Sequence, residues 1–189
     1  MGVGNEVTRR AAFLDRDGVI NRAIVRDGQP HPPADLKGLE LLPGVPAALS
    51  RLREVGFLSI VVTNQPDVAR GVSLRKDVEA INEKLRSELA LDAILVCWHD
   101  DAQACDCRKP KPGLLLQAAR DYGIDLSASY MVGDRWRDIE AGRSAGCRTV
   151  WINRGYKERA PQGADYETDG LPDAVDWILE NGGLHERRS

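Results

Sequence analysis

The sequence has no apolar run that approaches the ~20 residues needed to cross a bilayer, and it has no internal repeat or low-complexity block. It also lacks a basic excess, because the formal net charge is -3. General binding to nucleic acid is therefore not expected, since it depends on clustered Lys and Arg. The first residues do not contain the continuous apolar segment of a secretory signal, because Asp15 and Asp17 interrupt the apolar stretch. We expect a cytoplasmic protein that binds neither membranes nor nucleic acid.

The chain of 189 residues is 42% hydrophobic and 29% charged, which is typical of a soluble globular protein. This length suits one compact domain with a full core. We expect a flexible N-terminus over 1–10, a single domain over 11–182 and a short tail over 183–189. The sequence shows no heptad pattern and no obvious apolar surface stripe, so we expect a monomer.

Short apolar runs alternate along the chain with amphipathic helical patterns. Buried strands are predicted at 11–15, 57–64, 93–98, 129–134 and 148–153. Helices are predicted at 43–56, 73–90, 113–123, 138–146 and 171–183. This alternation predicts an α/β fold in which helices flank both faces of a parallel sheet.

Polar side chains follow the predicted strands, where sheets of this kind form their sites. Asp15 and Asp17 come after the first strand, and both carboxylates face one spot because they are two residues apart in extended chain. Thr63, Asn64 and Gln65 end the second strand and offer a hydroxyl, backbone amides and a carboxamide to an oxyanion. Taken alone, the acidic pair is equally typical of an acidic turn, and the second motif is more typical of a polar turn.

Lys109 follows the third strand and Asp134 follows the fourth. Asp138 lies in the first turn of the next predicted helix, where an acidic side chain interacts favourably with the helix dipole. Asp138 could therefore be a metal ligand or only a helix cap, and the sequence leaves both roles open. Carboxylates gathered at one edge would repel one another unless a hard cation such as Mg2+ bound between them. Lys109 and Thr63 would then hold phosphoryl oxygens. The combination predicts phosphoryl transfer to an aspartate, followed by hydrolysis.

Three of the four cysteines lie close to a histidine in one short stretch. The spacing C-x-H-x5-C-x-C gives Cys97, His99, Cys105 and Cys107. Three thiolates and an imidazole suit a tetrahedral structural Zn2+, with no position open for a reacting water. A disulfide is the alternative, and it would leave the histidine without a role. We expect this zinc to fix the loop that carries Lys109, while Mg2+ takes part in the reaction.

Four stretches, in this order and spacing, resemble the motifs of haloacid dehalogenase (HAD) superfamily phosphatases: FLDRDGVIN, VVTNQ, RKPKPG and VGDRWRD. The resemblance implies a Rossmann-like fold, and we expect no large cap domain because no large insertion separates the motifs. It implies that Asp15 is the nucleophile and Asp17 the general acid and base. It also implies that Thr63 and Lys109 stabilise the phosphoryl group, and that Asp134 binds Mg2+ with Asp15 and the backbone carbonyl of Asp17.

The zinc stretch narrows the resemblance to D-glycero-D-manno-heptose-1,7-bisphosphate 7-phosphatases and the related histidinol-phosphate phosphatases. The stretches DRDGVIN and TNQ..ARG are similar to the first group, and the short spacing between His99 and Cys105 is similar to the second. We expect removal of the 7-phosphate of the heptose bisphosphate, with histidinol phosphate or another small sugar phosphate as the alternative. A non-catalytic phosphosugar binder is disfavoured by the complete set of catalytic residues, and a nucleic-acid 3′-phosphatase by the acidic charge.

Substrate binding is expected from Asn64, Gln65, Arg108, Arg135 and Arg26. Arg108 neighbours the catalytic lysine, and its planar fork can hold a second phosphate with two hydrogen bonds. The stretch 21–33 could close over the sugar with Arg26 reaching in; a solvated surface position is the alternative. TNQPD replaces the usual TNQSG, CWH replaces CPH, and Arg135 stands where a lysine is common. These differences concern substrate recognition rather than catalysis.

Overall fold

The computed structural model describes residues 8–182. The flexible ends expected over 1–10 and 183–189 fall largely outside this range, so that division of the chain stays a prediction. Arg10 begins the first strand, one residue earlier than the pattern indicated. No helix within the described range is long and apolar enough to cross a membrane.

A six-stranded sheet in the order β5-β4-β1-β6-β7-β8, with every neighbouring pair parallel, forms the centre of the fold. Its strands are β1 (Arg10–Leu14), β4 (Phe57–Asn64), β5 (Ala93–Cys97), β6 (Tyr130–Gly133), β7 (Arg148–Ile152) and β8 (Tyr166–Thr168). The parallel sheet and its five longer strands confirm the predicted fold class. The edge strand β8 was not predicted, because three half-exposed residues carry no apolar run.

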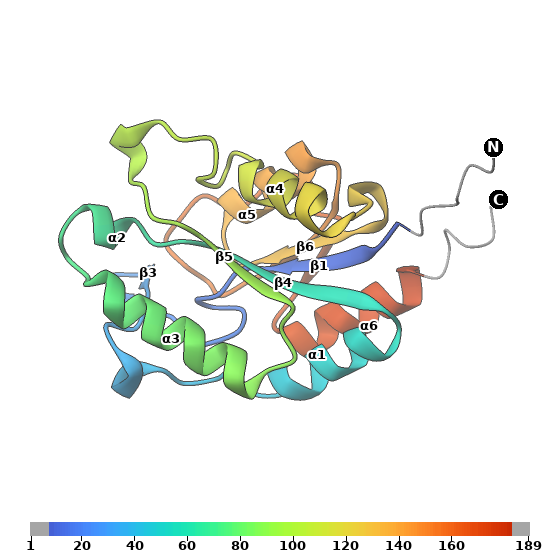
Figure 1. Ribbon diagram of the computed structural model, residues 1–189, viewed down its shortest axis with the longest axis horizontal. Helices are drawn as coiled ribbons and strands as arrows, with labels where there is room; N and C mark the ends of the chain where they lie inside the picture. The colour runs from blue at the N-terminus through green and yellow to red at the C-terminus, as the bar shows by residue number, and fades with distance from the viewer. Residues whose placement is uncertain (1–7, 183–189) are drawn as a thin grey trace.

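Helices cover both faces of the sheet, as Figure 1 shows: α4 and α5 lie on one side, and α1, α3 and α6 on the other. The helices are α1 (Val45–Glu54), α2 (Pro66–Ala69), α3 (Arg75–Glu88), α4 (Gly113–Tyr122), α5 (Trp136–Ala145) and α6 (Leu171–Gly182). Short 3-10 turns occur at Leu36–Gly38 (η1), Asp101–Gln103 (η2) and Leu126–Ala128 (η3). The predicted helices are all present, and the short helix α2 is additional.

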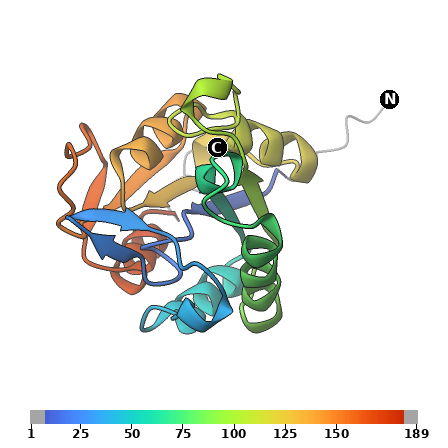
Figure 2. The same ribbon diagram turned by 90° about the vertical axis from the view of Figure 1, so that its left-hand side faces the viewer.

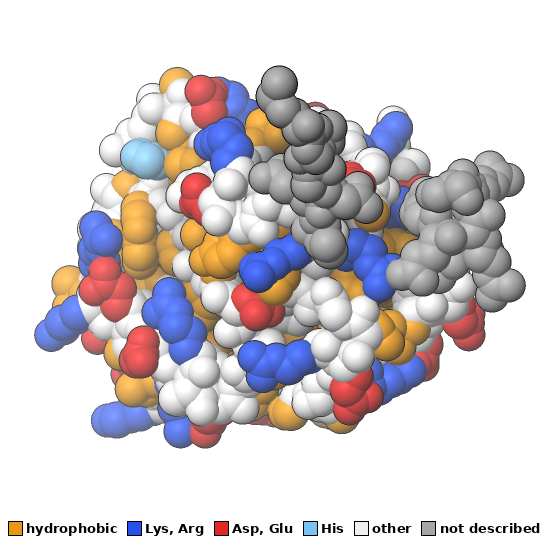
Figure 3. All heavy atoms as spheres, turned by 45° about the vertical axis from the view of Figure 1, so that its right-hand side comes forward, with side chains coloured by type: hydrophobic (Ala, Val, Ile, Leu, Met, Phe, Trp, Pro, Cys, Tyr) orange, Lys and Arg blue, Asp and Glu red, His pale blue; other side chains and the backbone are white. Residues whose placement is uncertain are grey.

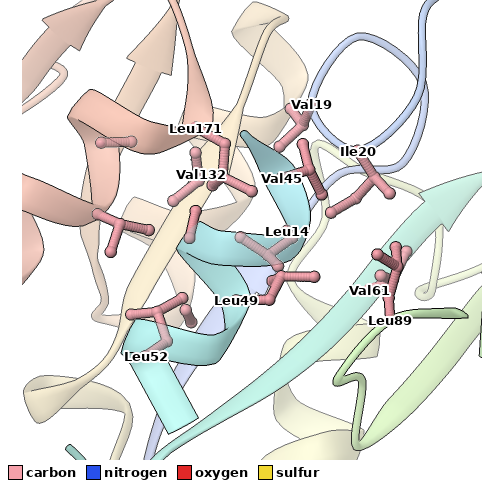
Figure 4. Packing of buried hydrophobic residues seen from close by; sticks show 14 of the residues in the cluster. Leu14, Val19, Ile20, Val45, Leu49, Leu52, Val61, Leu89, Val132 and Leu171 are labelled. Carbon is pink, nitrogen blue, oxygen red and sulfur yellow. The ribbon is translucent and has the colours of Figure 1, made fainter. Parts of the chain in front are cut away.

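The core divides into two layers because successive residues of each central strand point to opposite faces. In β1, Ala12 and Leu14 belong to the cluster under α1 and α6, whereas Phe13 packs on the side of α4 and α5. Figure 4 shows Leu49 of α1 close to Leu14 in the first cluster, with Leu52 further along the same helix. Full burial of one such side chain contributes about 1.5–3 kcal/mol. The sheet is thereby held rigidly, and its strand ends are fixed relative to one another.

The segment between β1 and α1 forms a small hairpin of β2 (Ile24–Arg26) and β3 (Gln29–His31). Asp27 and Gly28 make its turn with φ of 54° and 81°, as a tight hairpin turn requires. The loop after β7 holds the hairpin, because Lys157 N donates to Gly28 O at 2.8 Å and Gln29 Nε2 donates to Lys157 O at 2.6 Å. Figure 2 shows this hairpin in blue beside that loop.

On the face drawn in Figure 3, Lys and Arg side chains are interspersed with Asp and Glu side chains. This mixture agrees with the small net charge of -3.

Candidate active site and metal-binding residues

The strand ends at the middle of the sheet open onto a cavity of about 550 Å3. Asp15 follows β1, Thr63 lies near the end of β4, and both line this cavity. Asp134 follows β6, which pairs with β1 on the side away from β4. Lys109 reaches the same place from the loop after β5. Residues far apart in the chain thus meet at the sheet edge where the pattern placed them.

Three buried carboxylates gather at the floor of this region. Oxygen atoms of Asp15, Asp134 and Asp138 all lie within 4.8 Å of one another. Tyr156 donates its hydroxyl to Asp134 Oδ2 at 2.8 Å, whereas Asp134 Oδ1 is buried and has no hydrogen-bond partner within residues 8–182. A buried acceptor without a partner is unfavourable, and oxygen donors of this kind are what Mg2+ takes as ligands. The residues present therefore fit a hard divalent cation.

The electrostatics of the cluster point the same way. Burial raises the pKa of Asp15 to about 6, with Asp138 and Asp17 adding to the rise and Lys109 opposing it. Burial, together with the charges of Asp15 and Asp138, also raises the pKa of Asp134 well above its usual range. The carboxylates repel one another in their ionised forms, and a bound cation would favour those forms.

Lys109 supplies a positive charge inside this acidic cluster. Its ammonium lies 2.7 Å from Asp15 Oδ1, 2.6 Å from Asp138 Oδ1 and 2.7 Å from the carbonyl oxygen of Val62. Burial would lower the pKa of Lys109, but the charges of Asp138 and Asp15 outweigh burial and raise it. All three ammonium hydrogens have acceptors, so the lysine is held in one orientation.

Asn64 holds the backbone of Lys109 in place. The side chain of Asn64 donates to Lys109 O at 3.0 Å and accepts from Lys109 N at 3.1 Å.

Asp138 has a second contact besides Lys109, because Arg135 N donates to Asp138 Oδ2 at 3.0 Å at the start of α5. Asp138 therefore caps the helix and also lies in the carboxylate cluster, and its role as a metal ligand stays a prediction.

Asp17 lies beside the cluster but faces a different set of partners. Its carboxylate accepts from Asn21 Nδ2 at 2.9 Å and from Gln65 Nε2 at 2.9 Å, and it pairs with the fully buried Arg16 at 3.0 Å. Gln65 Nε2 also donates to Thr63 Oγ1 at 2.9 Å. One carboxamide thus connects Asp17 to the hydroxyl that ends β4, and both residues line the cavity.

Arginines line the cavity, among them Arg26, Arg108 and Arg135. Arg135 Nε donates to Glu158 Oε2 at 3.0 Å, and Arg108 pairs with Asp101 at 2.9 Å. Arg70 and Arg137 also line the cavity, and neither was among the substrate-binding residues expected from the sequence. Both lie inside the quoted stretches TNQ..ARG and VGDRWRD, but spacing alone does not show which arginine of a motif turns inward.

The Cys/His stretch folds into a compact cluster beside the cavity. The Sγ atoms of Cys97, Cys105 and Cys107 lie 3.2–3.6 Å from one another. His99 Nδ1 lies 3.7 Å from Cys97 Sγ and 3.4 Å from Cys107 Sγ. All the cysteines are free thiols, and four donor atoms at these separations fit a tetrahedral Zn2+.

The fold and this site together define the class, a phosphatase of the HAD-like hydrolases. The HAD-hydrolase-like family profile matches residues 106–178. The chain is 39% identical over 184 residues to D-glycero-beta-D-manno-heptose-1,7-bisphosphate 7-phosphatase of Escherichia coli (strain K12), covering 90% of this chain and 88% of that protein. D-glycero-D-manno-heptose-1,7-bisphosphate 7-phosphatase of Thermosynechococcus vestitus is 36% identical over 193 residues, covering 90% of this chain and 95% of that protein. Within the HAD-like hydrolases, the chain belongs to the family of heptose-bisphosphate phosphatases that these relatives represent.

A solved structure gives the same relationship. The D,D-heptose 1.7-bisphosphate phosphatase of B. bronchiseptica, crystallised with magnesium and phosphate, superposes with a TM-score of 0.77 at 30% sequence identity. The match covers 90% of this chain and 98% of that one. The bound magnesium and phosphate belong to that neighbour, and they agree with the class of chemistry that the carboxylates and Lys109 support here.

Proposed function

We propose that this enzyme removes the 7-phosphate of D-glycero-D-manno-heptose 1,7-bisphosphate in a Mg2+-dependent reaction. The observation that carries the proposal is the cavity itself. Its floor holds Asp15 and Lys109 for one phosphate, and its walls carry arginines that can receive a second anion. The printed names of the relatives agree with a bisphosphate substrate.

Asp15 acts as the nucleophile in this proposal. Its carboxylate attacks phosphorus and forms an acyl phosphate while the bond from phosphorus to the sugar oxygen breaks. Lys109, 2.7 Å from Asp15 Oδ1, orients the carboxylate and stabilises negative charge on the phosphoryl oxygens. Thr63 adds its hydroxyl from the end of β4. Mg2+ would be held by Asp15, Asp134 and the backbone carbonyl of Asp17, with Asp138 in the same cluster, and it would supply charge neutralisation.

Asp17 serves as the general acid and then as the general base. In the first half-reaction it gives its proton to the leaving sugar alkoxide. In the second, a water attacks the acyl phosphate, Asp17 takes the proton from that water, and the bond between phosphorus and Asp15 breaks. Gln65 and Asn21 hold the Asp17 carboxylate through hydrogen bonds of 2.9 Å each. The same acid thereby completes both half-reactions without a further proton donor.

Substrate contacts are proposed for Arg108, Arg135 and Arg26, which line the cavity. Asn64 and Gln65 complete the set, although their carboxamides already bind Lys109 and Asp17. Arginines that line the cavity favour a substrate with an anionic remote end. Histidinol phosphate would place a cationic amine among them, and like charges repel. The heptose bisphosphate is therefore the better match of the two.

We propose further that the enzyme is a cytoplasmic monomer with one structural Zn2+ held by Cys97, His99, Cys105 and Cys107. Thiolates that bind metal need a reducing compartment, where disulfides are rare. Light scattering on the purified protein measures the mass of the particle, and metal analysis measures the zinc content. A particle of twice the chain mass, or a protein purified without zinc, would contradict these statements.

The deciding experiment measures phosphate release, with Mg2+ present, from the α and β anomers of the heptose bisphosphate and from histidinol phosphate. We expect kcat/KM for one heptose anomer to exceed that for histidinol phosphate about a hundredfold, or ~2.7 kcal/mol of transition-state binding. The Asp15→Asn variant, purified in the same way, reports any contaminating phosphatase. A preference for histidinol phosphate would contradict the proposed substrate and leave the class of enzyme unchanged.

A further inference from the structure

Three arginines of the cavity converge on one carboxylate, that of Asp101 in the turn η2. Arg108 makes two contacts with it, Nε to Oδ1 at 2.9 Å and Nη2 to Oδ2 at 3.2 Å. Arg70 Nη2 lies 3.5 Å from Asp101 Oδ2, and Arg137 Nη1 lies 3.5 Å from Asp101 Oδ1. All four residues line the cavity that also contains Asp15.

The three arginines come from separate parts of the fold. Arg70 directly follows α2, Arg108 follows Cys107 of the Cys/His cluster, and Arg137 lies in the first turn of α5. Guanidinium groups brought together in this way repel one another. Asp101 and Asp67, whose Oδ1 lies 3.3 Å from Arg70 Nη1, together neutralise two of the three positive charges. The group therefore retains an excess of positive charge directed at the cavity.

Asp101 is a weak occupant of this position. Its side chain is 56% exposed, so it can turn into water at little cost, and ion pairs of such exposure contribute little to stability. A phosphate monoester offers more oxygen acceptors and more charge than a carboxylate, and it forms stronger charge-assisted bonds with arginine. A phosphate that reached the three guanidinium groups would therefore displace Asp101.

We propose that Asp101 is an internal anion that competes with the second phosphate of a bisphosphate for Arg70, Arg108 and Arg137. This rests on the proposed function in taking the ligand to be a bisphosphate. The product of hydrolysis keeps the second phosphate and so keeps its contacts with the arginines. When Asp101 returns to them, it displaces that phosphate and promotes release of the product. Asp101 thus lowers the affinity for the substrate and speeds release of the product.

The test compares two competitors of p-nitrophenyl phosphate turnover on the enzyme loaded with zinc and Mg2+. Fructose 1,6-bisphosphate has a second phosphate and fructose 6-phosphate does not, so the ratio of their inhibition constants measures the second anion site. We expect Asp101→Asn to raise the preference for the bisphosphate about tenfold, because the competing charge is gone. An unchanged or smaller preference in Asp101→Asn would overturn the proposal.

Matched variants separate this effect from a general change in charge. Asp106→Asn removes the same charge from the same loop, but the Asp106 side chain is 94% exposed and pairs with Lys111; the preference should stay at its native value. Arg137→Met should reduce it. If native enzyme fails to hydrolyse the heptose bisphosphate, the proposed function fails, while the ratio of inhibition constants still decides the role of Asp101.

Discussion

Lys109 and Asp138 form an ion pair in the interior, with 2.6 Å between Nζ and Oδ1, and neither side chain is more than 2% exposed. The same ammonium lies 2.7 Å from Asp15 Oδ1. One lysine therefore compensates carboxylates on two segments, the loop after β1 and the first turn of α5. Asn64, at the end of β4, fixes the backbone of this lysine through two hydrogen bonds.

Replacing Lys109 by Met should affect both activity and stability. The variant loses the charge that faces the phosphoryl oxygens, and we expect kcat/KM to fall about 10²–10³-fold. It also leaves buried carboxylates without their partner, so the unfolding free energy of the metal-free protein should fall by about 3–5 kcal/mol. Phosphate release and urea unfolding measure the two effects.

Lys111→Met is the matched control, since Lys111 lies two residues further along and pairs with Asp106 at the surface. Both quantities should stay near their native values in this variant. Equal losses in the two lysine variants would mean that the interior ion pairs of Lys109 contribute no more to activity and stability than the surface pair of Lys111 does.

Gly18 provides space for the carboxylate of Asp134, which we propose as a Mg2+ ligand. It has a φ of 96°, and a Cβ added there would overlap the Asp134 carboxylate and lie 2.9 Å from the Tyr156 hydroxyl. Gly18→Ala should therefore displace Asp134, lower the affinity for Mg2+, and reduce kcat about 10²-fold. Titration of activity with Mg2+ measures both changes.

Gly56→Ala tests whether backbone strain alone explains that loss. Gly56 has a φ of 82°, but no atom lies within 4 Å of an added Cβ. Both substitutions carry the cost of a positive φ, about 1 kcal/mol, and only the first reaches the site. We expect Gly56→Ala to be less stable yet fully active. Comparable Mg2+ dependence in both alanine variants would contradict this role of Gly18.

The sequence predicted the sheet and the floor of the site because both depend on local patterns. Strands buried on both faces are continuous apolar runs, and FLSIVVTN is the clearest of them. Once the strands are known, parallel topology brings their carboxyl ends to one edge of the sheet. The proximity of Asp15 and Asp134 could therefore be predicted from the sequence. Asp138 stayed open because a helix cap and a cluster member have the same sequence signature.

The walls of the cavity depend on tertiary contacts that no spacing encodes. The Tyr156 hydroxyl reaches Asp134 from a loop 22 residues away. Arg70, Arg137 and Asp101 meet only after α2, α5 and the loop that follows β5 are placed. The hairpin did have a local signal, since Asp27–Gly28 between short alternating segments is a strong turn motif. The edge strand β8 had none.

Asp17→Asn should abolish most turnover while the fold persists. Asparagine has nearly the same shape and keeps one oxygen, which can accept from either Asn21 or Gln65. It can neither donate a proton to the alkoxide nor accept one from water. We expect kcat to fall about 10²–10⁴-fold with little change in KM. Steady-state kinetics measure the loss of turnover, and far-ultraviolet circular dichroism checks that the fold persists. Retention of more than a tenth of native kcat would assign the proton transfer to another group.

The Cys/His cluster, with the zinc that we propose it binds, should act on catalysis through the loop that it holds. Cys107 lies two residues before Lys109 and its Sγ contacts Cys97 at the end of β5, so the metal would tie this loop to the sheet. Cys107→Ala should lower the melting temperature and reduce kcat/KM about tenfold or more, although no group that touches the phosphate is removed.

Cys147→Ala is the matched control for that variant. Cys147 is a buried thiol that lies outside the cluster, so its loss removes a similar side chain and leaves the proposed zinc ligands intact. Its zinc content and kcat/KM should remain native, with only a small fall in melting temperature. Strict removal of zinc from the native enzyme should reproduce the Cys107→Ala losses, and returning zinc should restore activity. If zinc removal changed neither activity nor melting temperature, the loop would be held by its protein contacts alone, and the cluster would need another explanation.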